Sequence, residues 1–141
     1  MTYYYELKSS KGESFRISDS ALKQSVTFRM MLDALGRIEA PIPISADSGT
    51  TSRIVEWSEE HREDVPRTEK IEGQQRFSTF DREFLGKERL SMEDLIRLAE
   101  TAEMLEIPLL YNLCCQRIVG DYLNGKSPEE IQTAFNPLQS G

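Results

Sequence analysis

The sequence predicts an α+β fold in which a small three-stranded sheet is flanked by helices. Alternating apolar and polar residues near the amino terminus are typical of a β-hairpin, whereas the second half of the chain has apolar residues at helical spacing. The chain has 141 residues, of which 38% are apolar. This is enough for one compact domain that buries its core without disulfides, metals or cofactors.

The first elements are expected to be two strands of a hairpin. Tyr5 and Leu7 alternate with charged residues, and Phe15 and Ile17 alternate with polar ones, on either side of a turn-forming Ser-Ser-Lys-Gly segment. Alternation with a period of two on both sides of a turn predicts a hairpin with one buried face. A third short strand is expected within residues 41–45, where two prolines restrict it to an edge of the sheet.

Two helices are expected next. The first follows a short helical turn and begins after Ser25, which suits an N-cap, and it ends at Gly36. Its core face is predicted to hold Phe28, Met31, Leu32 and Leu35. A helix is also expected around residues 53–61, with Ile54 and Trp57 turned inward, because a lone tryptophan at helical spacing is more often core than binding site.

Residues 59–79 are expected to form an acidic loop. From residue 56 to residue 72 there are seven acidic residues and three basic ones, and no apolar periodicity resumes until Phe77. Such a segment is typical of a solvated loop, and attraction of a basic partner is the less favoured alternative. Phe80, Phe84 and Leu85 then mark the return to the core.

Two longer helices are expected in the last part of this domain. In residues 91–105 one apolar stripe is opposed by a charged face, on which Met104 is the apolar exception. In residues 107–123 the apolar side chains cover an arc wider than the ~100° that a one-sided helix needs. This second helix is therefore predicted to pack on the core with one side and on a further helix or a partner with the other. The residues that define this arc are Leu110, Tyr111, Cys114, Cys115, Ile118, Val119 and Tyr122.

The segment that follows has two incompatible interpretations. The spacing of a phosphate-binding P-loop is matched by Gly120, Gly125, Lys126 and Ser127. A P-loop follows a buried strand, however, whereas a helix is expected immediately before this segment. Alternatively, Ser127 caps a short helix that begins with proline and has glutamate at its third position. We favour the capped helix, and the enzymatic alternative, a P-loop NTPase, is disfavoured.

Composition excludes several other classes. The net charge of -7 argues against partners that are nucleic acids or anionic membranes, and no apolar run approaches the ~20 residues that span a bilayer. An intracellular location, cytoplasmic or nuclear, is expected. The two cysteines are adjacent and His61 is the sole histidine, so neither a metal site nor a Cys/His nucleophile is supported.

Several short segments within these elements, taken in this order, are typical of one protein family. On these segments the chain resembles the Skp family of adaptors in Skp-cullin-F-box (SCF) ubiquitin ligases. The matching segments span most of the chain. They are Leu7-Lys-Ser-Ser-Lys-Gly-Glu13, Lys23-Gln-Ser-Val-Thr27 with Met31-Leu32 and Leu35-Gly36, Pro41-Ile-Pro43, Ile54-Val-Glu-Trp57, Asp81-Arg-Glu-Phe-Leu85, and Gly125-Lys-Ser-Pro-Glu-Glu-Ile131 with Phe135-Asn136.

The resemblance implies a BTB/POZ fold over residues 1–123 and the start of a Skp-type C-terminal extension over 124–141, without the last two helices of the family. It further implies a non-catalytic adaptor that joins an F-box protein to a cullin. Glu103 and Met104 match the cullin-binding pair, although the family usually has Asn and Tyr there. The residues expected to bind the F-box are Leu110, Cys114, Ile118, Ile131, Phe135 and Asn136. The alternatives are an elongin C-like module and a self-associating BTB module that forms a homodimer, with weak or no F-box binding.

Overall fold

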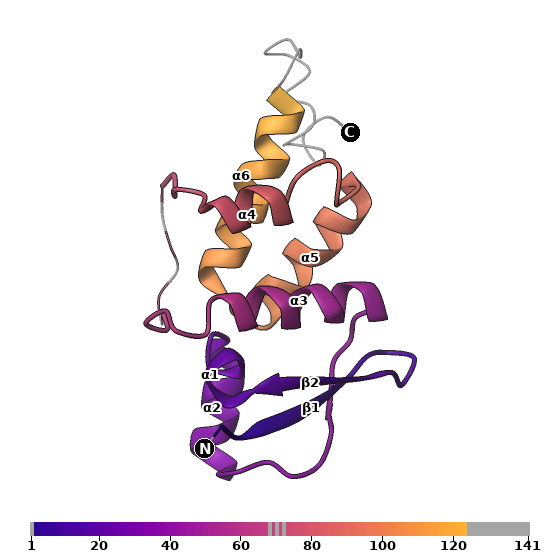
Figure 1. Cartoon of the computed structure of the whole chain (residues 1–141), viewed down its shortest axis with the longest axis vertical. Coiled ribbons are helices and arrows are strands. Elements are labelled where there is room, and N and C mark those ends of the chain that lie inside the picture. The colour runs from indigo at the N-terminus through magenta and orange to yellow at the C-terminus, as the bar shows by residue number, and fades with distance from the viewer. Residues whose placement is uncertain (1, 68, 70, 72, 124–141) are drawn as a thin grey trace, which may run out of the picture.

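The computed structural model describes residues 2–123, apart from residues 68, 70 and 72, and these residues form the expected α+β fold. Figure 1 shows the sheet with α1 and α2 at one end, α4, α5 and α6 at the other, and α3 between them. In chain order the elements are β1 (Tyr4–Lys8), β2 (Ser14–Ser18), α1 (Asp19–Leu22), α2 (Val26–Leu35), β3 (Ile42–Pro43), α3 (Ser48–Glu60), α4 (Thr79–Phe84), α5 (Met92–Met104) and α6 (Pro108–Leu123).

The sheet has the strand order β2-β1-β3, and the predicted hairpin is confirmed. The strands β1 and β2 are antiparallel, with Leu7 opposite Phe15, while β3 runs parallel to β1 with Ile42 opposite Leu7. Tyr5, Leu7 and Ile17 face the core because alternate residues of a strand share one face. The proline-containing β3 lies at an edge, as predicted, where a missing N–H costs no ladder bond.

Helix α2 is capped as expected but covers less of the core. The Ser25 hydroxyl accepts a hydrogen bond from the backbone N–H of Phe28 (3.1 Å), and Gly36 ends the helix with a φ of +73°. Phe28 is buried, whereas Leu35 is 70% exposed. The prediction that Leu35 belongs to the core is therefore wrong. It lies in the last turn of α2, which none of the described elements covers.

Helix α3 is longer than the sequence indicated. It begins at Ser48 because the Asp47 carboxylate accepts a hydrogen bond from the N–H of Thr50 (2.7 Å), an N-cap that the predicted start near residue 53 missed. Ile54 and Trp57 are both 1% exposed, so their inward orientation is confirmed. The helix contacts α1 and β2 on one side and α5 on the other, which places it at the centre of the fold.

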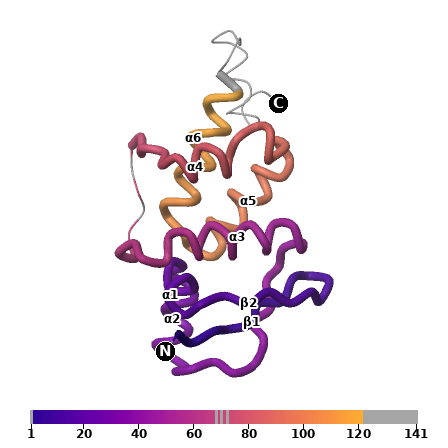
Figure 2. Tube along the Cα trace, in the orientation of Figure 1, coloured from indigo at the N-terminus to yellow at the C-terminus, as the bar shows by residue number. Residues whose placement is uncertain are grey.

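The segment between α3 and α4 has no helix or strand among its described residues, which agrees with the predicted loop. Figure 2 shows it leaving the end of α3 and passing beside α6 before it reaches α4. The Nδ2 atom of Asn112 donates to the carbonyl oxygens of Ile71 (3.1 Å) and Gly73 (3.2 Å), and Nε2 of Gln116 donates to that of Gln75 (3.0 Å). Two amide side chains of α6 therefore hold the backbone of this acidic loop, so it is less free than its composition suggests.

Helices α5 and α6 pack against each other as an antiparallel pair. Ser91 caps α5, and its apolar stripe is confirmed: Leu95, Leu98, Ala99, Ala102 and Leu105 are buried. The connection between the two helices is short and turns at Glu106, whose φ is +53°. A hydrogen bond from the N–H of Ile107 to the carbonyl of Ala102 (2.9 Å) closes this turn, as in a Schellman motif.

Substituting Glu106 by Gly should raise the free energy of unfolding by about 0.5–1 kcal/mol. Glycine adopts a positive φ without the steric cost of ~1–2 kcal/mol that a residue with a side chain carries. Part of this gain is offset because glycine loses more conformational entropy on folding. Urea denaturation would measure the change. Glu106→Ala keeps the strained φ and serves as the control. If the two variants had equal stability, the turn at residue 106 would not be strained.

Candidate functional site

The outer surface of α6 is the first candidate site, and the structure changes which of its residues reach the surface. Leu110 and Cys114 are completely buried, together with Leu113, which the sequence analysis did not single out. They occupy the side of α6 that packs on α5. The expectation that Leu110 and Cys114 contact a partner directly is not compatible with this burial, because neither side chain has any exposed surface.

The remaining apolar surface of α6 lies beside this buried side, at Ile118, and opposite to it, at Val119. Ile118 is half-buried and Val119 is 37% exposed, and both lie about one turn beyond the half-buried Cys115. Residues three and four apart share one face of a helix, so these side chains form one continuous strip. Of the residues expected to bind a partner from this helix, only Ile118 is at the surface. Ile131, Phe135 and Asn136 lie outside the described residues.

The two cysteines have no sign of catalytic or metal chemistry. Burial raises the pKa of the Cys114 thiol, so it remains protonated and unreactive. Hydrogen bonding to Cys115, together with nearby Glu103, raises the pKa of Tyr111 to about 12. Within the described part of the chain, no group of three or more His, Cys, Asp or Glu side chains could hold a metal ion.

The P-loop interpretation also finds no support before residue 124. A P-loop follows directly on a buried strand, whereas α6 is helical from Pro108 to Leu123. The lysine and serine of the match lie outside the described residues.

The end of α5 is the second candidate site. Glu103 and Met104 are both exposed, and the side chain of Met104 shows 47% of its surface although it is apolar. The hydroxyl of Thr27 donates to the carbonyl of Met104 (3.4 Å), and the N–H of Val26 donates to that of Glu106 (2.9 Å). Hydrogen bonds from the start of α2 therefore fix the end of α5, where Glu103 and Met104 lie at a corner of the domain.

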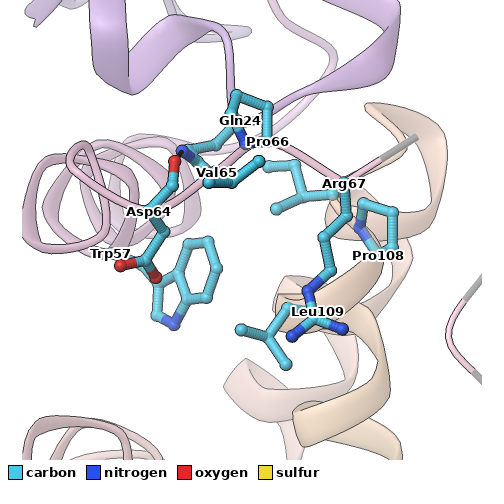
Figure 3. Close-up of a pocket in the computed structure, with 9 residues that line it drawn as sticks. Gln24, Trp57, Asp64, Val65, Pro66, Arg67, Pro108 and Leu109 are labelled. Carbon is cyan, nitrogen blue, oxygen red and sulfur yellow. Dashed lines mark hydrogen bonds between the residues drawn. The ribbon is translucent and has the colours of Figure 1, made fainter. Parts of the chain in front are cut away.

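A pocket of about 460 Å³ opens beside the first turn of α6. Figure 3 shows Val65, Pro66 and Arg67, from the segment after α3, facing Pro108 and Leu109. Val65 is 86% exposed. This apolar rim was not predicted, because the sequence analysis treated residues 59–79 as solvated.

A buried polar cluster joins the end of α3 to the start of α4. The Nε1 atom of Trp57 donates to Oδ1 of Asp81 (2.8 Å), and the ring of His61 stacks on Trp57. The two ring nitrogens of His61 lie 3.0 Å from Oδ1 of Asp81 and 2.6 Å from Oδ2 of Asp64. Both can donate only when the ring is protonated. The sole histidine therefore has a structural role in this cluster, which the sequence did not indicate because its partners are distant along the chain or have no recognisable spacing.

This cluster makes stability depend on pH. Burial lowers the pKa of His61, but hydrogen bonds to Asp81 and Asp64 outweigh this effect and raise it above its ordinary value of 6.5. A raised folded-state pKa contributes stability below the unfolded pKa, and this contribution is lost as pH rises through the folded value. The free energy of unfolding should therefore fall as pH rises above about 6.5, toward and through the folded pKa.

Urea denaturation at several pH values would measure this decrease, and His61→Gln, which does not titrate, serves as the control. A wild-type profile parallel to that of the variant above pH 6.5 would contradict the assignment.

Comparisons with known proteins agree with this architecture. Residues 5–63 match the family described as "Skp1 family, tetramerisation domain". The "E3 ubiquitin ligase complex SCF subunit sconC" of Arthroderma benhamiae is 31% identical over 136 residues, which cover 92% of this chain and 80% of that protein. The "Suppressor of kinetochore protein 1" of Schizosaccharomyces pombe is 28% identical over 138 residues, which cover 93% and 83%.

The matched region runs from β1 to just beyond α3, and the alignments with the full-length relatives extend through α5 and α6. None of the described helices has both the length and the apolar character that crossing a bilayer requires. The three-stranded sheet, the helices that flank it and the similarity over nearly the whole chain lead to one conclusion: this chain belongs to the Skp1 family.

Proposed function

We propose that this chain is a non-catalytic adaptor that links an F-box protein to a cullin in an SCF-type E3 ubiquitin ligase. The observation that carries the proposal is the presence of two separate exposed apolar sites on one rigid core, at the end of α5 and along the outer side of α6. The Arthroderma benhamiae relative is named as a subunit of an SCF ubiquitin ligase complex, which supports the same role. An adaptor needs two docking surfaces and no convergent catalytic groups.

The cullin N-terminal domain binds at Glu103 and Met104 in this proposal. Methionine is enriched at the cores of protein interfaces, and a side chain that is 47% exposed can bury much of its surface against a partner. Hydrogen bonds from α2 hold the backbone at this corner in the unbound chain, which lowers the entropy cost of ordering it when a partner binds.

The F-box protein binds along the outer side of α6, at Ile118 and Val119. Leu110 and Cys114 contribute indirectly in this proposal: they pack α6 onto α5 and do not contact the partner. We also propose Ile131, Phe135 and Asn136, which follow α6 in the sequence, as F-box-binding residues. Contact with a partner at Ile118 and Val119 accounts for an apolar arc of α6 that is too wide for one-sided packing.

Light scattering on a sizing column would test the proposal. The chain is run alone, with a purified F-box fragment, with a cullin N-terminal domain, and with both. We expect a complex that contains one copy of each protein. Met104→Asp should weaken cullin binding more than tenfold, because it buries an unpaired charge, and leave F-box binding unchanged. Leu35→Asp, at an exposed apolar residue in the last turn of α2, is the control.

Failure to bind either partner would contradict the adaptor role. A mass that doubles with concentration, without a complex, would instead favour the self-associating module.

A further inference from the structure

An apolar groove with an acidic edge lies next to the proposed cullin-binding pair. It has a volume of about 270 Å³ and opens where the start of α2, the end of α5 and the start of α6 meet. Its apolar walls come from Val26, Ala102, Ile107, Pro108 and Tyr111. This is smaller than the roughly 300–1,000 Å³ of pockets that hold drug-sized ligands, so a single protruding side chain suits it better than a small molecule.

Carboxylates from three different parts of the chain edge this groove. Glu103 comes from α5, Glu106 from the turn before α6, and Glu69 from the loop after α3. All three are exposed, and within the described residues none of them forms an ion pair and no lysine or arginine lines the groove. The edge therefore carries negative charge that this part of the chain leaves uncompensated.

The groove is continuous with exposed apolar surface. Met104 follows Glu103 directly and is 47% exposed. The hydroxyl of Thr27, which neighbours the groove residue Val26, contacts the carbonyl of Met104. Met30 lies one turn further along α2 from these residues and is 64% exposed. A partner that covers Met104 would thus meet the acidic edge at the same time.

The floor of the groove is rigid. Hydrogen bonds from the N–H groups of Val26 and Thr27 to the carbonyls of Glu106 and Leu105 join α2 to the turn after α5. Glu106 keeps a side chain at a positive φ, where glycine would be easier to accommodate. The backbone thus fixes the point at the groove from which the Glu106 side chain extends.

We infer that the groove receives a lysine or arginine side chain from the cullin, and that Glu103 and Glu106 select a cullin with a basic residue at this point. The occupant follows from charge complementarity, since the methylene stem of a long basic side chain packs on the apolar walls while its head meets the carboxylates. This inference rests on the proposed function, because it specifies the partner at the same corner of the domain.

The test compares Glu103→Gln/Glu106→Gln with the wild-type chain in binding a cullin N-terminal domain, by titration calorimetry at about 0.1 M and 0.5 M salt. We expect the double variant to bind about tenfold more weakly at low salt and to lose most of the salt dependence. Glu83→Gln/Glu88→Gln makes the same change in net charge at two exposed residues elsewhere and should behave as wild type. Thermal melting of each variant checks that it is folded.

The outcomes separate this inference from the proposed function. If the two double variants bound the cullin with equal affinity and equal salt dependence, the inference that the groove receives a basic side chain would be wrong, while the adaptor role would stand. No cullin binding by the wild-type chain would overturn the adaptor role itself, and this inference with it. Self-association of the chain that is weakened only by Glu103→Gln/Glu106→Gln would assign the groove to a second copy and overturn the cullin as occupant.

Discussion

Replacing Asp81 by Ala should lower the free energy of unfolding by about 3–5 kcal/mol, which is among the largest effects of any single substitution in this fold. The carboxylate is 2% exposed and accepts hydrogen bonds from Trp57, His61 and the hydroxyl of Ser78. Alanine removes the acceptor but leaves the donors buried, so each of them loses its partner at a cost greater than the net value of the bond.

The cost should be partly recovered in Asp81→Asn. The amide oxygen still accepts from Trp57, but the negative charge beside His61 is gone, so this variant separates the hydrogen bond from the charge. Urea denaturation at pH 6, below the ordinary pKa of histidine, gives the comparison. A loss of less than about 1 kcal/mol in Asp81→Ala would mean that water replaces the carboxylate at little cost.

The position of Asp81 explains why the effect reaches beyond one helix. Ser78 caps α4 by accepting from the N–H of Asp81 (3.0 Å), and the same residue receives Trp57 and His61 from α3. The cluster therefore fixes both ends of the acidic loop. With its ends held in this way, the loop places Val65 and Arg67 beside α6, where the rim of the pocket in Figure 3 forms.

Local patterns in the sequence were sufficient for much of the fold. The hairpin, the edge strand and the core stripe of α5 follow from periodicities of two and 3.6 residues, which depend only on near neighbours. The start of α3 was missed because Asp47 precedes Ser48 and Gly49, a sequence that also suits a turn. The cluster around Asp81 joins residues about 20 positions apart, and no local pattern indicates such a contact.

The sequence predicted the two surfaces of the candidate site, but it did not predict correctly every residue that is exposed on them. The exposure of Met104 followed from its place among charged residues, and the structure confirms it. The wide apolar arc of α6 indicated two packed sides, yet periodicity cannot say which side meets the core. That depends on where α5 lies, and it places Leu110 and Cys114 inside and Val119 outside. The pocket rim at Val65 depends on tertiary contacts of a loop whose composition suggested only solvent.

Leu110→Ala and Val119→Asp should separate the two sides of α6. Leu110 is completely buried, so its truncation should lower the free energy of unfolding by about 2–5 kcal/mol through lost burial and a residual cavity. Val119 is 37% exposed, and its replacement should change stability by no more than about 1 kcal/mol. Urea denaturation of the chain without partners measures both changes.

Binding to an F-box fragment should show the opposite order. Val119→Asp places a charge where the partner would bury an apolar side chain, so we expect the affinity to fall more than tenfold. Leu110→Ala should retain its affinity per folded molecule, measured at a temperature where the variant is still folded. Ser20→Asp, on the exposed surface of α1, controls for added charge. If Leu110→Ala lost binding while folded and Val119→Asp did not, the partner would have to reach the side of α6 that now faces α5, and the two helices would have to separate when the partner binds.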